Sequence, residues 1–300
     1  MSWRLTAIVL FAQVAACSSP GVAPVGAAPA RAPQAGADPS GPNAVDPSKA
    51  SSPEIRRTLV AHEDIPAMQG FESRIYLIEY PPGAQAPLHA HTEQTVGFVI
   101  EGSLESAFGN GPLSLKHAGE GFVEIPREPH RFRNPDPSRP LRYVVTGAFR
   151  KEEAPFQLVP GNTSLQSAPA EPAAPPAERS PLPASAPSGA LTEVRRTLVA
   201  QRELTDFPGM ESRMYLCEFP PSASSKVHIH TAQGIGYVLD GSFESAFGDG
   251  PMTVKRAGDG FIDTPGLPHR FRNPDARVPL RFLVAGTYHK DEPLMKVIEQ

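Results

Sequence analysis

Short apolar runs rich in β-branched and aromatic residues recur along the chain, and turn residues close each of them. Clear examples are residues 74–80 (RIYLIEY), 96–100 (VGFVI) and 141–145 (LRYVV), bordered by segments such as Pro-Pro-Gly and Glu-Gly. Runs of this length and composition predict β-strands. The segments 103–108 and 113–116 flank Gly-Asn-Gly, which predicts a hairpin. Because no amphipathic helical pattern stands out, we expect an all-β fold of sandwiches or barrels.

The whole pattern occurs twice in the chain. Residues 54–153 and 193–292 align without a gap, at a constant offset of 139 residues. A chain of 300 residues is long enough for two domains with separate cores. We therefore expect two tandem β-domains, the first over 54–160 and the second over 191–300.

Two other segments have a composition that cannot build a core. Residues 18–53 and 161–190 are rich in Ala, Pro, Ser and Gly and hold almost no large apolar side chains. Such segments bury too little apolar surface to offset the entropy that folding costs. We predict a disordered tether over 18–53 and a Pro/Ala-rich interdomain linker over 161–190.

The first seventeen residues have the organisation of a secretory signal. Arg4 provides a positive charge, residues 5–16 are apolar but too short to span a bilayer, and small residues precede Cys17. The string Val-Ala-Ala-Cys resembles the lipobox of bacterial lipoproteins, which implies that residues 1–17 hold a signal peptide and that Cys17 is lipidated. Ser18 in the next position implies the outer membrane. An ordinary signal peptide with a coincidental Cys is the alternative.

Charge and cysteine content exclude several classes of protein. The formal net charge of −4 and the pI of about 6.2 leave no basic excess for binding nucleic acid. Apart from Cys17, the only cysteine is Cys217, which aligns with Ile78 of the first repeat. A cysteine that exchanges with Ile in an apolar strand is expected to be a buried small hydrophobe, and no disulfide framework is available.

Three histidines recur in each repeat, and they carry the candidate chemistry. A strand directs side chains two residues apart to the same face, so each His-x-His pair presents two imidazoles together. A third histidine from a distant strand completes three sides of a metal site. The predicted ligands are His89, His91 and His130 in the first repeat and His228, His230 and His269 in the second.

These histidines and the glycines around them resemble the two sequence motifs of the cupin superfamily. The first motif is matched by Gly83, His89, His91 and Gly102, and in the second repeat by His228, His230 and Gly241, with Ser222 in place of the first glycine. The second motif is matched by Gly119, His130 and Asn134, and by Gly258, Gly266, His269 and Asn273. The resemblance implies a bicupin: two jelly-roll barrels (double-stranded β-helices), each holding one divalent transition metal, Fe, Mn, Zn, Cu or Ni.

One position departs from the family pattern. The glutamate ligand of the first motif falls on Thr95 and Gly234, and neither residue replaces a carboxylate. The neighbouring Gln94 and Gln233 recur in both repeats and are candidates for a fourth ligand or for a group that hydrogen-bonds to one. Glu93 offers a carboxylate in the first repeat only. We therefore expect three neutral imidazoles with open metal positions, a site that favours small chelating anions.

Other repeated polar residues have structural interpretations. Glu72-Ser73-Arg74 and its counterpart at 211–213 suggest either a substrate clamp or, preferably, an inter-strand ion pair. The motif asparagines are expected to anchor turns. The arginines beside His130 and His269 are expected to point away from the metal, as solvated charge. Phe98 and its counterpart Tyr237 are expected in the barrel core.

Three functions remain open from the sequence. The first is a metal-dependent dioxygenase acting on a small chelating anion, as the family resemblance implies. The second is an isomerase or decarboxylase that uses the metal as a Lewis acid. The third is a non-catalytic module that binds metal or a small ligand such as a sugar. Fold does not decide among them. The expected partners are a small anionic ligand, a lipid anchor in the cell envelope, and a second barrel, within the chain or in a homodimer.

Overall fold

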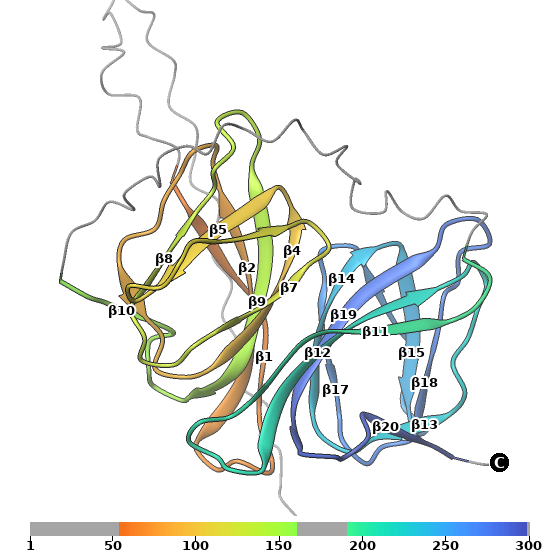
Figure 1. Cartoon of the computed structure of the whole chain (residues 1–300). Coiled ribbons are helices and arrows are strands. Elements are labelled where there is room, and N and C mark those ends of the chain that lie inside the picture. The colour runs from red at the N-terminus through yellow and green to blue at the C-terminus, as the bar shows by residue number, and fades with distance from the viewer. Residues whose placement is uncertain (1–53, 161–190, 299–300) are drawn as a thin grey trace, which may run out of the picture. The chain divides into compact units, whose positions relative to one another are not determined.

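The computed structural model describes residues 54–160 and 191–298 (Figure 1). Within these residues the chain forms twenty β-strands and no helix, which confirms the all-β expectation. No helix among them is therefore long and apolar enough to cross a membrane. The predicted signal peptide, tether and linker lie outside the described residues.

The first repeat forms the strands β1 to β10, and the predicted apolar runs all lie within them. Their bounds are β1 Arg56–Asp64, β2 Phe71–Tyr80, β3 His89–Ala90, β4 Thr95–Glu101, β5 Ser103–Phe108, β6 Ser114–His117, β7 Gly121–Glu124, β8 His130–Arg133, β9 Leu141–Arg150 and β10 Gln157–Leu158. The antiparallel pair β5–β6 is the hairpin that Gly-Asn-Gly predicts.

The second repeat forms β11 to β20 in the same order. Their bounds are β11 Arg195–Glu203, β12 Met210–Phe219, β13 His228–His230, β14 Gly234–Asp240, β15 Ser242–Phe247, β16 Thr253–Arg256, β17 Gly260–Asp263, β18 His269–Arg272, β19 Leu280–His289 and β20 Met295–Val297.

Each repeat is a barrel of two antiparallel five-stranded sheets. The sheet orders in the first repeat are β1-β2-β9-β4-β7 and β10-β3-β8-β5-β6, and the second repeat has β11-β12-β19-β14-β17 and β16-β15-β18-β13-β20. The chain crosses between the two sheets several times in each repeat, as in a jelly roll. Side chains from both sheets pack between them, among them Tyr76, Leu104 and Phe132 in the first repeat. Aromatic rings fill the second core, where Phe243 and Phe271 have centroids 5.1 Å apart.

A third apolar cluster joins the two repeats, which belong to one compact unit. It contains Val96 and Phe98 of β4 together with Met214, Ile235 and Tyr237 of the second repeat. The prediction that Phe98 and Tyr237 fill the barrel interiors was therefore wrong. Successive side chains of a strand point to opposite faces, so Phe98 points outward when the neighbouring Val99 packs in the core of its own barrel.

Two glycines allow a close and reciprocal approach of the repeats. A Cβ atom on Gly121 of β7 would clash with the carbonyl oxygen of Val199 on β11. A Cβ atom on Gly260 of β17 would lie 3.0 Å from the carbonyl oxygen of Val60 on β1. Gly260 and Val199 are the counterparts of Gly121 and Val60, so each repeat makes the same contact with the other. A larger residue at either glycine would push the two repeats apart.

The substitution of the first motif glycine keeps the backbone conformation. Gly83 has a φ of 70°, a left-handed conformation that favours glycine, and Ser222 adopts a φ of 62° at the same place. Both residues donate a backbone hydrogen bond to an aspartate carbonyl, Asp136 and Asp275 respectively, at 2.8 Å. The turn before the His-x-His pair therefore has the same form in both repeats.

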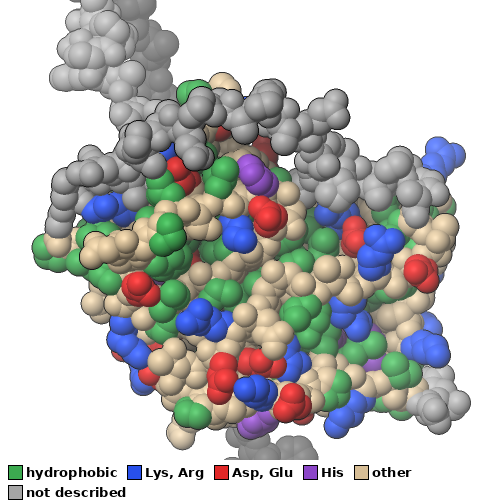
Figure 2. All heavy atoms as spheres, viewed as in Figure 1, with side chains coloured by type: hydrophobic (Ala, Val, Ile, Leu, Met, Phe, Trp, Pro, Cys, Tyr) green, Lys and Arg blue, Asp and Glu red, His purple; other side chains and the backbone are tan. Residues whose placement is uncertain are grey.

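The visible surface carries charges of both signs. Basic and acidic side chains are interspersed on the face that Figure 2 shows, without a continuous basic area. This distribution agrees with the small net charge of the chain.

Candidate metal centres

The structure brings the three predicted histidines of the first repeat together. His89 lies on β3 and pairs directly with His130 on β8, while His91 follows β3 on the same face. The ring centroids of His89 and His130 are 4.4 Å apart, and those of His91 and His130 are 5.1 Å apart. All three side chains are buried, and one nitrogen of each lies within 4.8 Å of the others, as in a site that can hold a metal ion.

The second repeat builds the same triad. His228 and His230 lie on β13, and His228 pairs with His269 on β18. The centroid of the His269 ring is 4.4 Å from that of His228 and 5.0 Å from that of His230. These three are also buried and also lie within 4.8 Å of one another. Each cupin-like unit therefore has one candidate metal site, as predicted.

Backbone carbonyls fix the orientation of five of the six rings, while Nδ1 of His230 has no hydrogen-bond partner. The Nδ1 atoms of His89, His91 and His130 lie 2.7–2.9 Å from the carbonyl oxygens of Pro87, Pro155 and Glu128. In the second repeat, Nδ1 of His228 and Nδ1 of His269 contact the carbonyls of Lys226 and Leu267 at 2.8 and 3.0 Å. A carbonyl only accepts, so Nδ1 carries the proton and Nε2 offers a lone pair.

The freed nitrogens are where a metal ion would bind. The Nε2 atoms of His91, His130, His230 and His269 are buried and have no hydrogen-bond partner. Buried polar atoms are normally paired, so four such atoms at two points of convergence need an explanation. A divalent cation at each point would satisfy them, and imidazole nitrogen suits Zn, Cu, Fe and Ni.

Burial also keeps these imidazoles in the form that binds metal. Loss of hydration lowers the pKa of His91, His130 and His269 to about 4 and that of His230 to about 3. The pKa values of His89 and His228 are lowered too, again chiefly by burial. All six rings are therefore neutral at neutral pH, as metal coordination requires.

Each triad also has a carboxylate beside it, which we did not predict. Glu124 on β7 places Oε2 3.1 Å from Nε2 of His91, and Asp263 on β17 places Oδ2 3.5 Å from Nε2 of His230. Both carboxylates are buried, and burial raises the pKa of Asp263 to about 7. The sites therefore contain more than three neutral imidazoles. The repeat offset, which aligns Glu124 with Asp263, is the signal in the sequence that identifies them.

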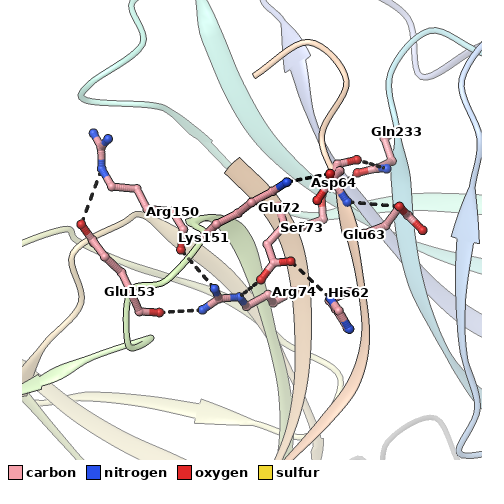
Figure 3. Close-up of polar contacts among 10 residues, drawn as sticks. All are labelled: His62, Glu63, Asp64, Glu72, Ser73, Arg74, Arg150, Lys151, Glu153 and Gln233. Atoms are coloured by element: carbon pink, nitrogen blue, oxygen red, sulfur yellow. Dashed lines mark hydrogen bonds and ion pairs between the residues drawn. The ribbon is translucent and has the colours of Figure 1, made fainter. Parts of the chain in front are cut away.

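The structure turns Gln94 and Gln233 toward the other repeat. Nε2 of Gln94 donates to the carbonyl of Arg202 at 3.1 Å, and Nε2 of Gln233 donates to the carbonyl of Asp64 at 2.6 Å. Gln233 also accepts a hydrogen bond from Ser73 at 3.1 Å (Figure 3). Alternation explains the direction, because the next residue, Thr95, points into its barrel and donates to Glu124. These amides therefore hold the repeats together.

Glu93 is engaged away from the triad as well. Its carboxylate lies 3.2 Å from the guanidinium of Arg150. It is therefore paired on the outer side of the first barrel.

The repeated Glu-Ser-Arg segment forms an ion pair within one strand. Nε of Arg74 donates to Glu72 at 2.6 Å, and both residues lie on β2, two positions apart (Figure 3). Arg74 also donates to the carbonyls of Arg150 and Glu153. Glu72 also makes the expected inter-strand contact, because Nδ1 of His62 on β1 lies 3.2 Å from its Oε2. The contacts of Arg74 tie β2 to the end of β9.

The structure confirms the turn-anchoring asparagines and the buried cysteine, but two of the arginines expected as solvated charge form ion pairs. Nδ2 of Asn134 donates to the carbonyls of Pro81 and Arg139 at 3.0 and 2.8 Å, and Asn273 makes the matching bonds, so both asparagines anchor turns. Arg133 and Arg272 pair with acidic side chains on the neighbouring strand. Cys217 is buried, and burial raises its pKa to about 11.

A cavity of about 380 Å³ leads to the triad of the first repeat. It reaches His89, His91 and Glu124, and Arg57 lies on its outer part. Its other walls are Ile55, Ile78, Tyr80, Ala86, Pro87, Tyr143, Val145, Phe156 and Leu158. A small molecule of mixed polarity can therefore reach the first candidate metal.

Comparison with known proteins gives the same fold. Residues 76–147 and 215–286 each match the family described as the cupin domain. No curated protein is similar to the chain in sequence.

Solved structures of low identity resemble the chain. An oxalate decarboxylase structure has a TM-score of 0.50 at 14% identity, covering 83% of this chain and 80% of its own. Salicylate 1,2-dioxygenase from Pseudaminobacter salicylatoxidans has a TM-score of 0.48 at 12% identity, covering 73% and 75%. AerE from Microcystis aeruginosa has a TM-score of 0.49 at 14% identity, covering 77% and 99%. The two cupin-domain matches and the four sheets show two tandem cupin-like units, consistent with a bicupin, with one three-histidine metal site in each.

Proposed function

We propose that the protein is a metal-dependent oxygenase whose first repeat binds a small chelating anion. One observation carries this proposal: the cavity of about 380 Å³ connects the triad of His89, His91 and His130 to the guanidinium of Arg57. A metal at the triad and a fixed cation at the entrance together select an anion that spans both.

Arg57 is the anchor for a negative group. Its side chain is exposed at the cavity, and its guanidinium lies 4.2 Å from the ring centroid of Phe156. Stacking on an aromatic face holds the planar guanidinium in place, and its fork of donors matches a carboxylate. An anion bound there would direct its remaining part toward the triad.

Two phenols add neutral hydrogen-bonding groups to the same cavity. Burial raises the pKa of Tyr80 to about 12 and that of Tyr143 well above its ordinary value, so both stay protonated at neutral pH. The other walls, such as Val145 and Leu158, are apolar. This lining suits an anion with an apolar body and one or two oxygen atoms.

His89, His91 and His130 would hold the metal, and a redox-active metal there would supply the electron transfer that oxygenation needs. The chain's own residues orient the anion through Arg57 and keep the imidazoles neutral by burial. The enclosing barrel limits access of bulk water to the reacting groups.

The test is oxygen consumption by the purified chain loaded with Fe²⁺, Mn²⁺ or Cu²⁺, with the redox-inactive Zn²⁺ as a control. Hydroxybenzoates, 2-oxo acids and β-diketones form the substrate panel, and products are identified by mass. We expect O₂ uptake with at least one anion and its loss in Arg57→Ala. Arg196→Ala, the same change in the second repeat, is the matched control and should retain activity. Turnover without O₂ would identify a Lewis-acid enzyme, and saturable binding without turnover a binding module.

We also propose that the protein is anchored in the cell envelope through Cys17. The apolar segment 5–16 and the Val-Ala-Ala-Cys string support this proposal. Metabolic labelling with a radioactive fatty acid tests it: the wild type should carry label in the membrane fraction, and Cys17→Ser should lose both label and membrane association. Identical fractionation without label in either protein would refute the anchor.

A further inference from the structure

We propose that Glu124 and Asp263 are metal ligands, each supplying across a strand pair the carboxylate that Thr95 and Gly234 lack. The cupin motif places its glutamate on the strand that follows the His-x-His pair, and this chain has no carboxylate at that position. The inference rests on metal binding by the two triads, which is part of the proposed function, and does not depend on oxygenase chemistry.

The strand register makes such a relocation possible. Thr95 of β4 pairs directly with Glu124 of β7, and Gly234 of β14 pairs directly with Asp263 of β17. Residues directly opposite in an antiparallel pair project from the same face, with Cβ atoms about 4.5–5.5 Å apart. A carboxylate on either strand of the pair can therefore reach the same point inside the barrel.

In each repeat, one carboxylate oxygen lies at, or slightly beyond, the spacing of two ligands of one ion from a triad nitrogen. Oε2 of Glu124 lies 3.1 Å from Nε2 of His91, and Oδ2 of Asp263 lies 3.5 Å from Nε2 of His230. Two atoms each bound at about 2.1 Å to one cation are roughly 3.0–3.4 Å apart, for angles between 90° and tetrahedral. Because Nδ1 of His91 is engaged with a carbonyl, its Nε2 lone pair faces the carboxylate, and a cation between them would satisfy both.

Asp263 gives the most direct indication. Its side chain is fully buried, and neither carboxylate oxygen has a hydrogen-bond partner. Buried polar atoms are normally paired, so these two oxygens need a partner. A cation bound at the adjacent triad would be that partner.

In each repeat, the residue opposite the carboxylate on the paired strand suits the length of that carboxylate side chain. The Thr95 hydroxyl donates to Glu124 and holds the longer side chain. Gly234 leaves room for the shorter one, because a Cβ atom there would lie 3.1 Å from Oδ2 of Asp263. The Thr–Glu pair and the Gly–Asp pair therefore each place a carboxylate at the same position beside the triad.

The test measures metal affinity one site at a time. In the His228→Ala/His230→Ala background, Co²⁺ is titrated against a chelator and its visible spectrum is recorded. Glu124→Gln should weaken Co²⁺ binding by at least about 10-fold and change the spectrum, because an anionic oxygen donor is lost. Glu93→Gln, which removes a buried carboxylate paired with Arg150, is the matched control and should change neither.

The double variant Thr95→Glu/Glu124→Thr moves the carboxylate to the opposite strand and should recover most of the lost affinity. Asp263→Asn, in a His89→Ala/His91→Ala background, repeats the test where no existing hydrogen bond is broken. Thermal unfolding checks that every variant is folded. Unchanged Co²⁺ affinity and spectrum in Glu124→Gln, or in Asp263→Asn if the former does not fold, would overturn the proposal. Neither readout depends on turnover, so failure of the oxygenase proposal would leave this result intact.

Discussion

The two repeats hold the same triad in different surroundings. The cavity of the first repeat contains the phenols of Tyr80 and Tyr143, and the aligned residues of the second repeat are Phe219 and Phe282. The ring centroids of these phenylalanines are 5.7 Å apart, within the second core. Metal-binding residues have thus stayed the same where cavity residues have changed. Holding a metal and accepting a ligand are separable properties of this fold.

The cation near each site also differs in its engagement. Arg57 stacks on Phe156 at the cavity, whereas the guanidinium of its counterpart Arg196 lies 3.2 Å from the sulfur of Met295. The first repeat therefore presents a cation on an aromatic surface beside its triad. This difference supports the proposal that the anion binds in the first repeat.

The largest expected effect concerns metal content. His89→Ala/His91→Ala should remove one of two bound ions per chain, and His228→Ala/His230→Ala should remove the other, because each triad is complete within its own repeat. Elemental analysis of protein saturated with Co²⁺ measures this directly. Loss of both ions in either variant would show that the sites are coupled, and one ion in the wild type would show that one triad is silent.

The next prediction concerns whether the two repeats unfold together or independently. Phe98→Ala should lower the free energy of unfolding by about 3–5 kcal/mol, because a fully buried aromatic side chain is removed from the cluster between the repeats. Urea unfolding followed by far-UV circular dichroism provides the measurement. We expect one transition in the wild type.

Leu104→Ala is the control for Phe98→Ala, because it removes a side chain from the core of the first repeat and not from the cluster between the repeats. Two well-separated unfolding transitions in the wild type would contradict the expectation that the repeats unfold together.

A smaller effect should distinguish the two arginines. Arg57→Ala should weaken salicylate binding to the Co²⁺-loaded protein by about 10-fold, the loss of one charged hydrogen-bonded contact of about 1.4 kcal/mol. Arg196→Ala should leave it unchanged. Titration followed by the Co²⁺ absorption bands is the measurement. Equal weakening in both variants would mean that the anion site is not confined to the first repeat.

The smallest effect concerns Cys217. Burial raises its pKa to about 11, so the thiol stays protonated at pH 8 and should react with iodoacetamide only after unfolding. Cys217→Ile, which copies the first repeat, should change the free energy of unfolding by less than about 1.5 kcal/mol. Rapid alkylation of the native protein, followed by mass spectrometry, would show that this strand opens.

The strands and the triads could be predicted because both follow from local patterns. Short apolar runs closed by turn residues predict the strands, and the repeat separates recurring histidines from the others. Glu124 and Asp263 were missed because their position beside the triads depends on the register of two strands that are distant in the sequence. A motif read along one strand does not show what the paired strand contributes.

The orientation of Phe98 was hidden for a different reason. β4 is buried on both faces, by its own core and by the other repeat, so the run VGFVI has no polar side. A continuous apolar run predicts burial, but it does not show which residues point into the barrel and which point toward the other repeat. The same alternation, applied to Glu72 and Arg74, would have placed their ion pair within one strand.

The reciprocal glycine contacts have a consequence for how the repeats can change. Gly121 against Val199 and Gly260 against Val60 are the contacts of a two-fold isologous interface, here enclosed in a single polypeptide. In a homodimer, every substitution enters both halves at once. In this chain a substitution enters one half only. One barrel can therefore acquire a new ligand while the other barrel keeps its original structure and continues to support the first through their shared contacts.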